Sequence, residues 1–143
     1  MERVAECGCG RLKVRVQGEP LRVLACHCDF CLRRTGSAYP VAAQFSEEQV
    51  LEITGDSTVY NGLELEGVGA GGIDVGISYN FCTTCGSTVY WTFDTVPEEL
   101  TEFLSGVVGV AVGNFADPDF PPPTQHHFPD LRPRWLTPHP DPA

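Results

Sequence analysis

Cys7-Gly8-Cys9-Gly10 stands near the start of the chain, and Cys82-Thr83-Thr84-Cys85-Gly86 follows more than seventy residues later. C-x-C and C-x-x-C spacings bring two sulfurs within reach of one ion, whereas such close neighbours rarely suit a relaxed disulfide. The last cysteine of each cluster precedes a glycine, which can take the positive φ of a tight turn whose amides point back at sulfur. We therefore expect one closed four-thiolate zinc site that joins the start of the chain to a later strand, with the ligands Cys7, Cys9, Cys82 and Cys85.

The three remaining cysteines lie in Cys26-His27-Cys28-Asp29-Phe30-Cys31, which continues with leucine rather than glycine. A zinc ion held by three thiolates keeps one position for water or substrate, as catalytic zinc ions do. On an extended segment, Cys26 and Cys28 share one face and His27 points to the other, which favours packing or a hydrogen bond for this histidine. We expect Cys26, Cys28 and Cys31 to hold a second, catalytic zinc. A distant His126, His127 or aspartate could still close the site, and an iron–sulfur cluster could use the same cysteines.

The chain has the size and composition of one soluble domain. Of its 143 residues, 42% are hydrophobic and 20% charged, and no run approaches the roughly eighteen apolar residues of a membrane span. The net charge of −10 excludes nucleic acid as a partner, because phosphate binding needs a basic surface. Seven cysteines cannot all pair within one chain, and the first residues include no basic or apolar leader. We therefore expect a cytoplasmic protein with no membrane partner.

Short strands dominate the sequence pattern. Polar and apolar residues alternate at period two in Arg11–Val16 and Ile73–Tyr79, which is typical of strands with one wet face. Further short stretches are rich in apolar or β-branched residues and are bounded by Gly, Pro or polar clusters, which favours strand over helix. These are Leu21–Ala25, Tyr39–Phe45, Ser87–Phe93 and Val107–Val112. The pattern predicts antiparallel sheets.

Helix and loop signals are brief. Ser46–Gln49 has the spacing of a capping box, and Pro97–Leu100 places proline and acids in a first turn, so each predicts a turn or two of helix. Glycine-rich Leu63–Gly72 predicts a flexible loop or irregular hairpin, and proline-rich Asp117–Thr124 predicts a loop. We expect one zinc-binding domain over residues 1–136 and a mobile C-terminal tail over residues 137–143.

Further motifs accompany the cysteines. Arg33, Arg34 and Gly36-Ser37 follow the middle cluster, and Phe81–Ser87 contains the last one. Near the C-terminus, His126, Asp130, Arg132 and Trp135 have the spacing H-x-x-x-D-x-R-x-x-W. From Glu6 to Leu136 the chain therefore resembles the glutathione-dependent formaldehyde-activating enzyme (GFA) family, which also includes centromere protein V.

This resemblance implies a mainly β, β-tent fold, in which several coiled antiparallel sheets with short helical turns form a single domain. It implies two Zn²⁺ per chain, a structural ion on the outer two clusters and a catalytic ion on the middle one. It also implies a zinc-dependent carbon–sulfur lyase. Such an enzyme adds a small-molecule thiol, glutathione in the family, to formaldehyde or a related small electrophile and gives S-hydroxymethylglutathione.

The negative net charge of the chain implies that a site for an anionic substrate needs nearby cations. Seven thiolates would subtract seven charges from −10 and two Zn²⁺ would restore four, so the resulting −13 repels an anionic thiol such as glutathione. Guanidinium groups suit carboxylates, although each arginine could instead pair with a surface acid. A serine could contact substrate or only complete a turn, and a histidine could shuttle a proton or only pack the C-terminal segment. The candidate substrate-binding residues are Arg33, Arg34, Ser37, His126 and Arg132.

Two further expectations remain. Phe128 and Trp135 are expected to anchor the C-terminal segment on the core. As an alternative to an enzyme, the fold could be a non-catalytic protein-interaction module in which zinc is purely structural. A fourth protein ligand on the Cys26, Cys28 and Cys31 ion would favour that alternative.

Overall fold

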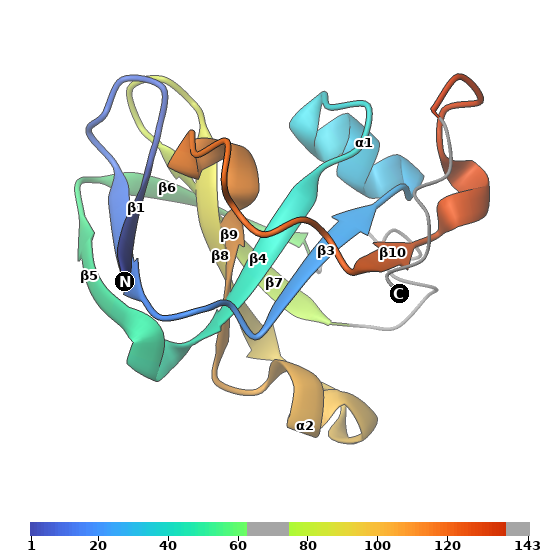
Figure 1. Ribbon diagram of the computed structural model, residues 1–143. Helices are drawn as coiled ribbons and strands as arrows, with labels where there is room; N and C mark the ends of the chain where they lie inside the picture. The colour runs from blue at the N-terminus through green and yellow to red at the C-terminus, as the bar shows by residue number, and fades with distance from the viewer. Residues whose placement is uncertain (63–74, 137–143) are drawn as a thin grey trace.

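Two β-sheets make up most of the computed structural model, which describes residues 1–62 and 75–136 (Figure 1). The smaller sheet has the strand order β1-β2-β5, from Glu2–Glu6, Lys13–Gln17 and Val50–Thr54. The larger sheet has the order β10-β3-β4-β9-β8-β7-β6. Its strands are β3 (Arg22–Cys26), β4 (Val41–Ser46), β6 (Ser57–Asn61), β7 (Gly76–Cys82), β8 (Thr88–Thr95), β9 (Val107–Ala111) and β10 (Gln125–His127). The predicted mainly β, single-domain fold is confirmed.

Each predicted strand is found in the described part of the chain, with ends shifted by a few residues. The strands β1, β5, β6 and β10 were missed, because much of their surface faces solvent. In β1, for example, only Ala5 is buried, so no apolar alternation shows in the sequence. Leu63–Gly72 and residues 137–143, predicted to be a loop and a mobile tail, lie outside the described residues, as do the first two residues of Ile73–Tyr79.

One strand pair departs from the expected antiparallel sheets. Strand β10 runs parallel to β3, with His126 opposite Ala25 and His127 opposite Cys26. The backbone N–H of His27 extends this ladder by donating to the His127 carbonyl at 3.0 Å. The stretch before it, Asp117–Thr124, contains no helix or strand, as its prolines predict. The returning C-terminal segment therefore lies beside the middle cysteine cluster.

The helices are short. The predicted turns appear as η1 (Glu47–Gln49), where the Ser46 N–H donates to Gln49 Oε1 at 2.9 Å, and as η4 (Glu98–Leu100), which leads into α2 (Thr101–Leu104). Sequence patterns did not predict α1, η5 or η6, which span Asp29–Thr35, Val112–Phe115 and Pro129–Leu131. Within residues 1–62 and 75–136, none of the helices has the length and apolar character needed to cross a membrane.

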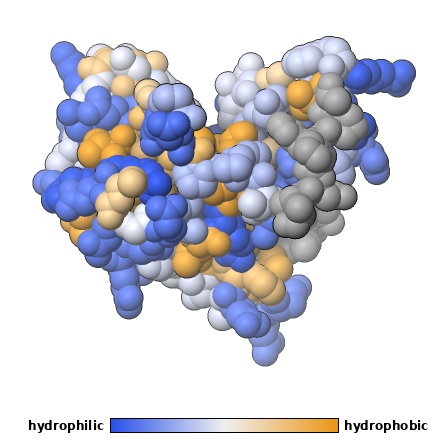
Figure 2. Space-filling view, in the orientation of Figure 1, coloured by the Kyte–Doolittle hydropathy of each residue, from blue (hydrophilic) through white to orange (hydrophobic). Residues whose placement is uncertain are grey.

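The core draws side chains from both sheets. Strand β2 contributes Val14 and Val16, while β4 contributes Phe45 and β9 contributes Val110. Cys7 is buried in the same cluster. Outside the core, polar side chains cover much of the face in Figure 2, and apolar side chains show near its centre. The core cluster therefore includes one cysteine from each outer pair, Cys7 and Cys82.

A glycine opposite Trp91 decides where its indole lies. Gly109 of β9 pairs with Trp91 of β8, and a Cβ at this glycine would lie inside the indole ring. The absent side chain lets the indole lie across the neighbouring strand, where Trp91 is 8% exposed.

Replacing this glycine tests the packing. Gly109→Ala should lower the free energy of unfolding by about 1–3 kcal/mol, because the added methyl overpacks the indole. Gly113→Ala is the matched control, since a Cβ there meets nothing within 4 Å. Chemical denaturation followed by circular dichroism measures both variants. Equal losses in the two would contradict this account of Trp91.

Candidate metal centres and the adjoining cavity

The four outer cysteines come together across the fold. Their sulfurs all lie within 4.8 Å of one another, with Sγ–Sγ distances of 3.6 Å for Cys7–Cys9 and 3.7 Å for Cys9–Cys82. Four sulfurs at about 2.3 Å from a tetrahedral zinc ion are about 3.8 Å apart, whereas a disulfide holds two at about 2 Å. All seven cysteines are free thiols. The group Cys7, Cys9, Cys82 and Cys85 could therefore hold a metal ion, and its spacing fits zinc.

The predicted glycine turns are present in both outer clusters. Gly10 and Gly86 each have φ of 77°. The N–H of Gly10 donates to the Cys7 carbonyl, and that of Gly86 to the Cys82 carbonyl, both at 2.9 Å. The two segments thus form matching turns, each of which places its cysteines around a common point.

The sulfurs of this group differ in how readily they lose a proton, because their pKa values shift in opposite directions. Hydrogen bonds from the Ser87 hydroxyl and amide lower the pKa of Cys85 to about 5. The Arg11 amide favours the Cys9 thiolate, but desolvation and the neighbouring sulfurs together raise the pKa of Cys9 to about 11. Four thiolates therefore form together only if a cation balances them, which is the chemistry of a zinc site.

The middle cluster is built at the junction of β3 and α1. Cys26 ends β3, Cys28 caps the N-terminus of α1, and Cys31 lies in the first turn of that helix. The Cys28 Sγ accepts a hydrogen bond from the Cys31 N–H at 3.4 Å and lies 3.5 Å from the Cys26 Sγ. All three sulfurs lie within 4.8 Å of one another. The short segment that caps α1 thus also sets the spacing of the three sulfurs.

The thiols of the middle cluster also differ in how readily they lose a proton. Hydrogen bonding to the Cys31 thiol is the largest cause that lowers the pKa of Cys26, to about 6. The same interaction and burial raise the pKa of Cys31 well above its usual range. One thiolate thus forms readily and hinders the next, so this donor set also fits a divalent cation.

No fourth His, Cys, Asp or Glu joins these three sulfurs within the part of the chain that the structure describes. His27 is 2% exposed, and its ring packs against Tyr39 and His126 at centroid distances of 5.8 Å and 6.1 Å. This packing agrees with the expectation that His27 points away from the metal position. Three thiols with no further ligand leave room for a small molecule.

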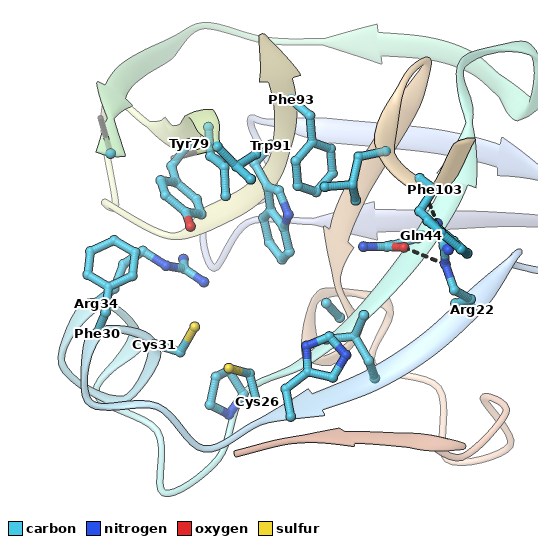
Figure 3. Close-up of a pocket in the computed structure, with 18 of the residues that line it drawn as sticks. Arg22, Cys26, Phe30, Cys31, Arg34, Gln44, Tyr79, Trp91, Phe93 and Phe103 are labelled. Carbon is cyan, nitrogen blue, oxygen red and sulfur yellow. Dashed lines mark hydrogen bonds between the residues drawn. The ribbon is translucent and has the colours of Figure 1, made fainter. Parts of the chain in front are cut away.

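A cavity of about 410 Å³ opens beside the middle cluster, within the range of roughly 300–1,000 Å³ of small-molecule sites. Figure 3 shows Cys26 and Cys31 at one end, Tyr79, Trp91 and Phe93 along a wall, and Arg22, Gln44 and Phe103 at the other end. The remaining described residues that line it are Leu24, Phe30, Arg34, Pro40, Ala42, Gly62, Val75, Ile77, Leu100, Leu104, Gln125 and His127. The cavity is apolar along most of its length and ends at two thiols.

Arg34 is held in this cavity by aromatic rings. Its guanidinium carbon lies 4.1 Å from the centroid of the Tyr79 ring and 5.2 Å from that of Trp91. Such contacts contribute about 0.5–2 kcal/mol each. Its Nε is buried and has no hydrogen-bond partner among the described residues. Arg34 is therefore oriented by stacking and keeps its donors available.

The phenol of Tyr79 lies against this arginine. Burial is the largest cause that raises the pKa of Tyr79, to about 12, and nearby thiolates act in the same direction against the opposing effect of Arg34. Its hydroxyl therefore stays protonated at neutral pH and can donate a hydrogen bond into the cavity.

The other candidate substrate residues lie outside the described lining of the cavity. Arg33 and Ser37 are exposed, and the Ser37 Oγ accepts a hydrogen bond from the Tyr39 N–H at 3.3 Å. Arg132 donates to the Pro129 carbonyl at 2.9 Å, within the C-terminal segment. His126 stacks on His27 instead, because alternation along β10 turns Gln125 and His127 toward the cavity.

Several lining residues were not found from the sequence. Tyr79 and Trp91 lie opposite each other in the β7–β8 register, and Gln44 comes from β4. The alternation of Trp91 and Phe93 is visible in the sequence. The sequence does not show toward which face of the sheet these two side chains point. The expectation for Trp135 was wrong, since its side chain is 73% exposed and does not anchor the C-terminal segment.

Two serine substitutions separate the clusters. We expect the natural chain to hold two zinc ions. Cys82→Ser should lose one and unfold or precipitate, because the sulfur is buried in the core cluster. Cys28→Ser should lose the other and keep its fold, because a serine hydroxyl also caps a helix. Metal analysis, soluble yield and thermal unfolding measure these outcomes, and equal loss of fold in both variants would contradict the division.

Comparison with known proteins places the whole site within one family. The family model described as glutathione-dependent formaldehyde-activating enzyme matches residues 2–130 of the 143-residue chain. Comparison with curated proteins gives no significant match. The matched segment contains all seven cysteines and the cavity residues described above. The chain belongs to the glutathione-dependent formaldehyde-activating enzyme family.

Proposed function

We propose that this protein is a zinc-dependent carbon–sulfur lyase that joins a thiol to formaldehyde or a related small electrophile. The observation that carries the proposal is the three-thiol group Cys26, Cys28 and Cys31, two of whose members line a cavity of about 410 Å³. Family membership supplies the expected reactants, glutathione and formaldehyde. Free thiols throughout the chain suit a reducing compartment, so we place the protein in the cytoplasm.

The two cysteine groups take different roles in this proposal. The four outer cysteines hold a structural zinc ion, and the three middle cysteines hold a catalytic one. When bound to three thiolates, zinc favours the thiolate form of a substrate thiol near neutral pH and keeps it nucleophilic. The chain's own contribution is to hold those ligands at the end of the cavity and to surround the reactants with apolar walls.

The addition balances without a redox cofactor. The substrate sulfur forms a bond to the carbonyl carbon, the carbonyl π pair moves to oxygen, and the thiol proton ends on that oxygen. The product is a hemithioacetal, S-hydroxymethylglutathione for the family's reactants. The reverse reaction breaks the same carbon–sulfur bond, so the enzyme class is a lyase.

Two side chains are placed to assist this chemistry. Tyr79 keeps its phenolic proton and can donate it in a hydrogen bond to the oxygen that gains charge. Arg34, stacked on Tyr79, can hold a carboxylate of the thiol substrate. Arg33 and Arg132 remain candidates for attracting an anionic substrate from outside the cavity, and Ser37 and His126 remain candidates for contacting it. Orientation of two small reactants in one cavity accounts for much of the expected rate gain.

Exchange measurements test the reactants. Two-dimensional exchange NMR on formaldehyde, glutathione and their adduct should show faster interconversion with zinc-loaded protein than in buffer. Cys31→Ser should lose this acceleration, because it removes a ligand that lines the cavity. Tyr79→Phe should slow exchange by about tenfold or more while leaving the zinc content unchanged.

Controls separate this reaction from the non-catalytic alternative. Protein stripped of zinc should exchange the reactants no faster than buffer. If zinc-replete natural protein gives no acceleration with any thiol and aldehyde, the enzyme assignment fails. A fourth protein ligand on the ion at Cys26, Cys28 and Cys31 would then identify a structural zinc and an interaction module.

A further inference from the structure

The composition of the cavity wall restricts what can occupy it. Trp91, Phe93, Ile77 and Leu104 provide most of an aromatic and aliphatic surface between its two ends. The chain contains 19 acidic side chains, yet none of them is among the described residues that line this cavity. The cavity therefore offers apolar walls to the body of a ligand, and no carboxylate among its described lining residues repels a ligand carboxylate.

Arg34 provides a place for that carboxylate. It has no ion-pair partner among residues 1–62 and 75–136, and its buried Nε lacks a hydrogen bond. A guanidinium held flat by two rings presents its remaining donors in a fixed fork, which suits a carboxylate bound through two oxygens. No described carboxylate pairs with this guanidinium, so its charge can meet an anionic ligand.

The second arginine in the cavity is different. Arg22 Nε donates to Gln44 Oε1 at 2.8 Å, and another of its nitrogens donates to the Phe103 carbonyl. Its guanidinium also lies over the Phe103 ring, at 5.7 Å from the centroid. These contacts close the far end of the cavity with polar groups that already have partners, so a single carboxylate is best bound at Arg34.

Arg34 and the reactive end are close together. Cys31 and Arg34 are three residues apart on α1, so their side chains are neighbours on the helix surface. Figure 3 shows both turned into the same end of the cavity. A ligand that reaches both therefore carries its sulfur and its carboxylate on adjacent or nearly adjacent carbons.

We infer that the preferred thiol is a mercaptocarboxylic acid with one carboxylate and an apolar, ring-sized body. The carboxylate binds Arg34, the sulfur points to Cys26 and Cys31, and the body lies along Trp91 and Phe93. Glutathione carries two carboxylates, an ammonium group and two peptide bonds, and many of these would lose water without gaining partners here. The role of the sulfur rests on the proposed function, whereas the carboxylate site stands on the cavity alone.

A sulfur-free pair of probes tests the carboxylate site. Isothermal titration calorimetry on the zinc-loaded full chain compares hydrocinnamate with hydrocinnamyl alcohol, which has the same phenyl body and no charge. We expect the acid to bind at least about tenfold more tightly than the alcohol. Arg34→Gln should remove this difference. Arg134→Gln is the matched control, because it removes the same charge from an exposed arginine outside the described lining of the cavity and should preserve the difference.

Three outcomes would overturn the inference. Equal affinity for acid and alcohol in the natural chain would show that no carboxylate site exists, whether or not the variants fold. Equal losses in Arg134→Gln and Arg34→Gln would show a general effect of charge. A preference for the acid that survives in folded Arg34→Gln would place the carboxylate on the metal instead.

A comparison of two thiol substrates tests the role of the sulfur. With formaldehyde, α-mercaptohydrocinnamate should react with a larger kcat/KM than glutathione, and Arg34→Gln should lose most of this advantage through a raised KM. A larger kcat/KM for glutathione would contradict the inferred thiol. If hydrocinnamate binds as expected and neither thiol reacts faster than in buffer, the carboxylate site stands and the proposed reaction fails.

Discussion

The closure of four thiols around one point is the constraint on which the rest of the structure depends. Cys7 and Cys9 follow the first strand of the smaller sheet, whereas Cys82 ends β7 of the larger sheet and Cys85 lies in the turn that leads to β8. Metal binding at such sites in zinc fingers contributes about 10–16 kcal/mol, as much as the whole net stability of a typical domain, about 5–15 kcal/mol. Because Cys7 and Cys82 are also members of the core cluster, a metal ion bound there would hold the two sheets together jointly with the hydrophobic core.

The middle cluster offers thiol ligands like those of the outer cluster, but its surroundings are different. The middle cysteines sit where β3 passes into α1, and the Cys28 sulfur also caps that helix. One short segment thus sets the ligand positions and directs α1 so that Arg34 reaches the rings of Tyr79 and Trp91. The outer group is tied into paired turns, whereas the middle group faces an apolar cavity. In the proposed function, fold stability and chemistry are therefore assigned to separate clusters.

The cavity depends on contacts that are distant in sequence. Gly109 makes room for the indole of Trp91, and the register of β7 with β8 sets Tyr79 beside it. The C-terminal segment returns as β10, parallel to β3, and turns His127 rather than His126 toward the cavity. An isolated three-residue strand after a proline-rich loop has no pattern of its own, since its hydrogen bonds come entirely from a strand a hundred residues earlier.

Local chemistry by itself was enough to divide seven cysteines into groups of four and three, because spacing and the glycine after Cys9 and Cys85 depend only on neighbours in the chain. The same local patterns indicated a mainly β domain and six of its strands. Tertiary structure alone decided which charged and aromatic side chains meet. Arg33 and Arg34 are adjacent and chemically identical, yet only Arg34 lines the cavity, because the direction of a side chain on α1 depends on how that helix packs against β7 and β8. For an anionic thiol substrate, net charge predicted that Arg33, Arg34 or Arg132 would lie near the middle cluster, and packing determined that only Arg34 of these three lines the cavity.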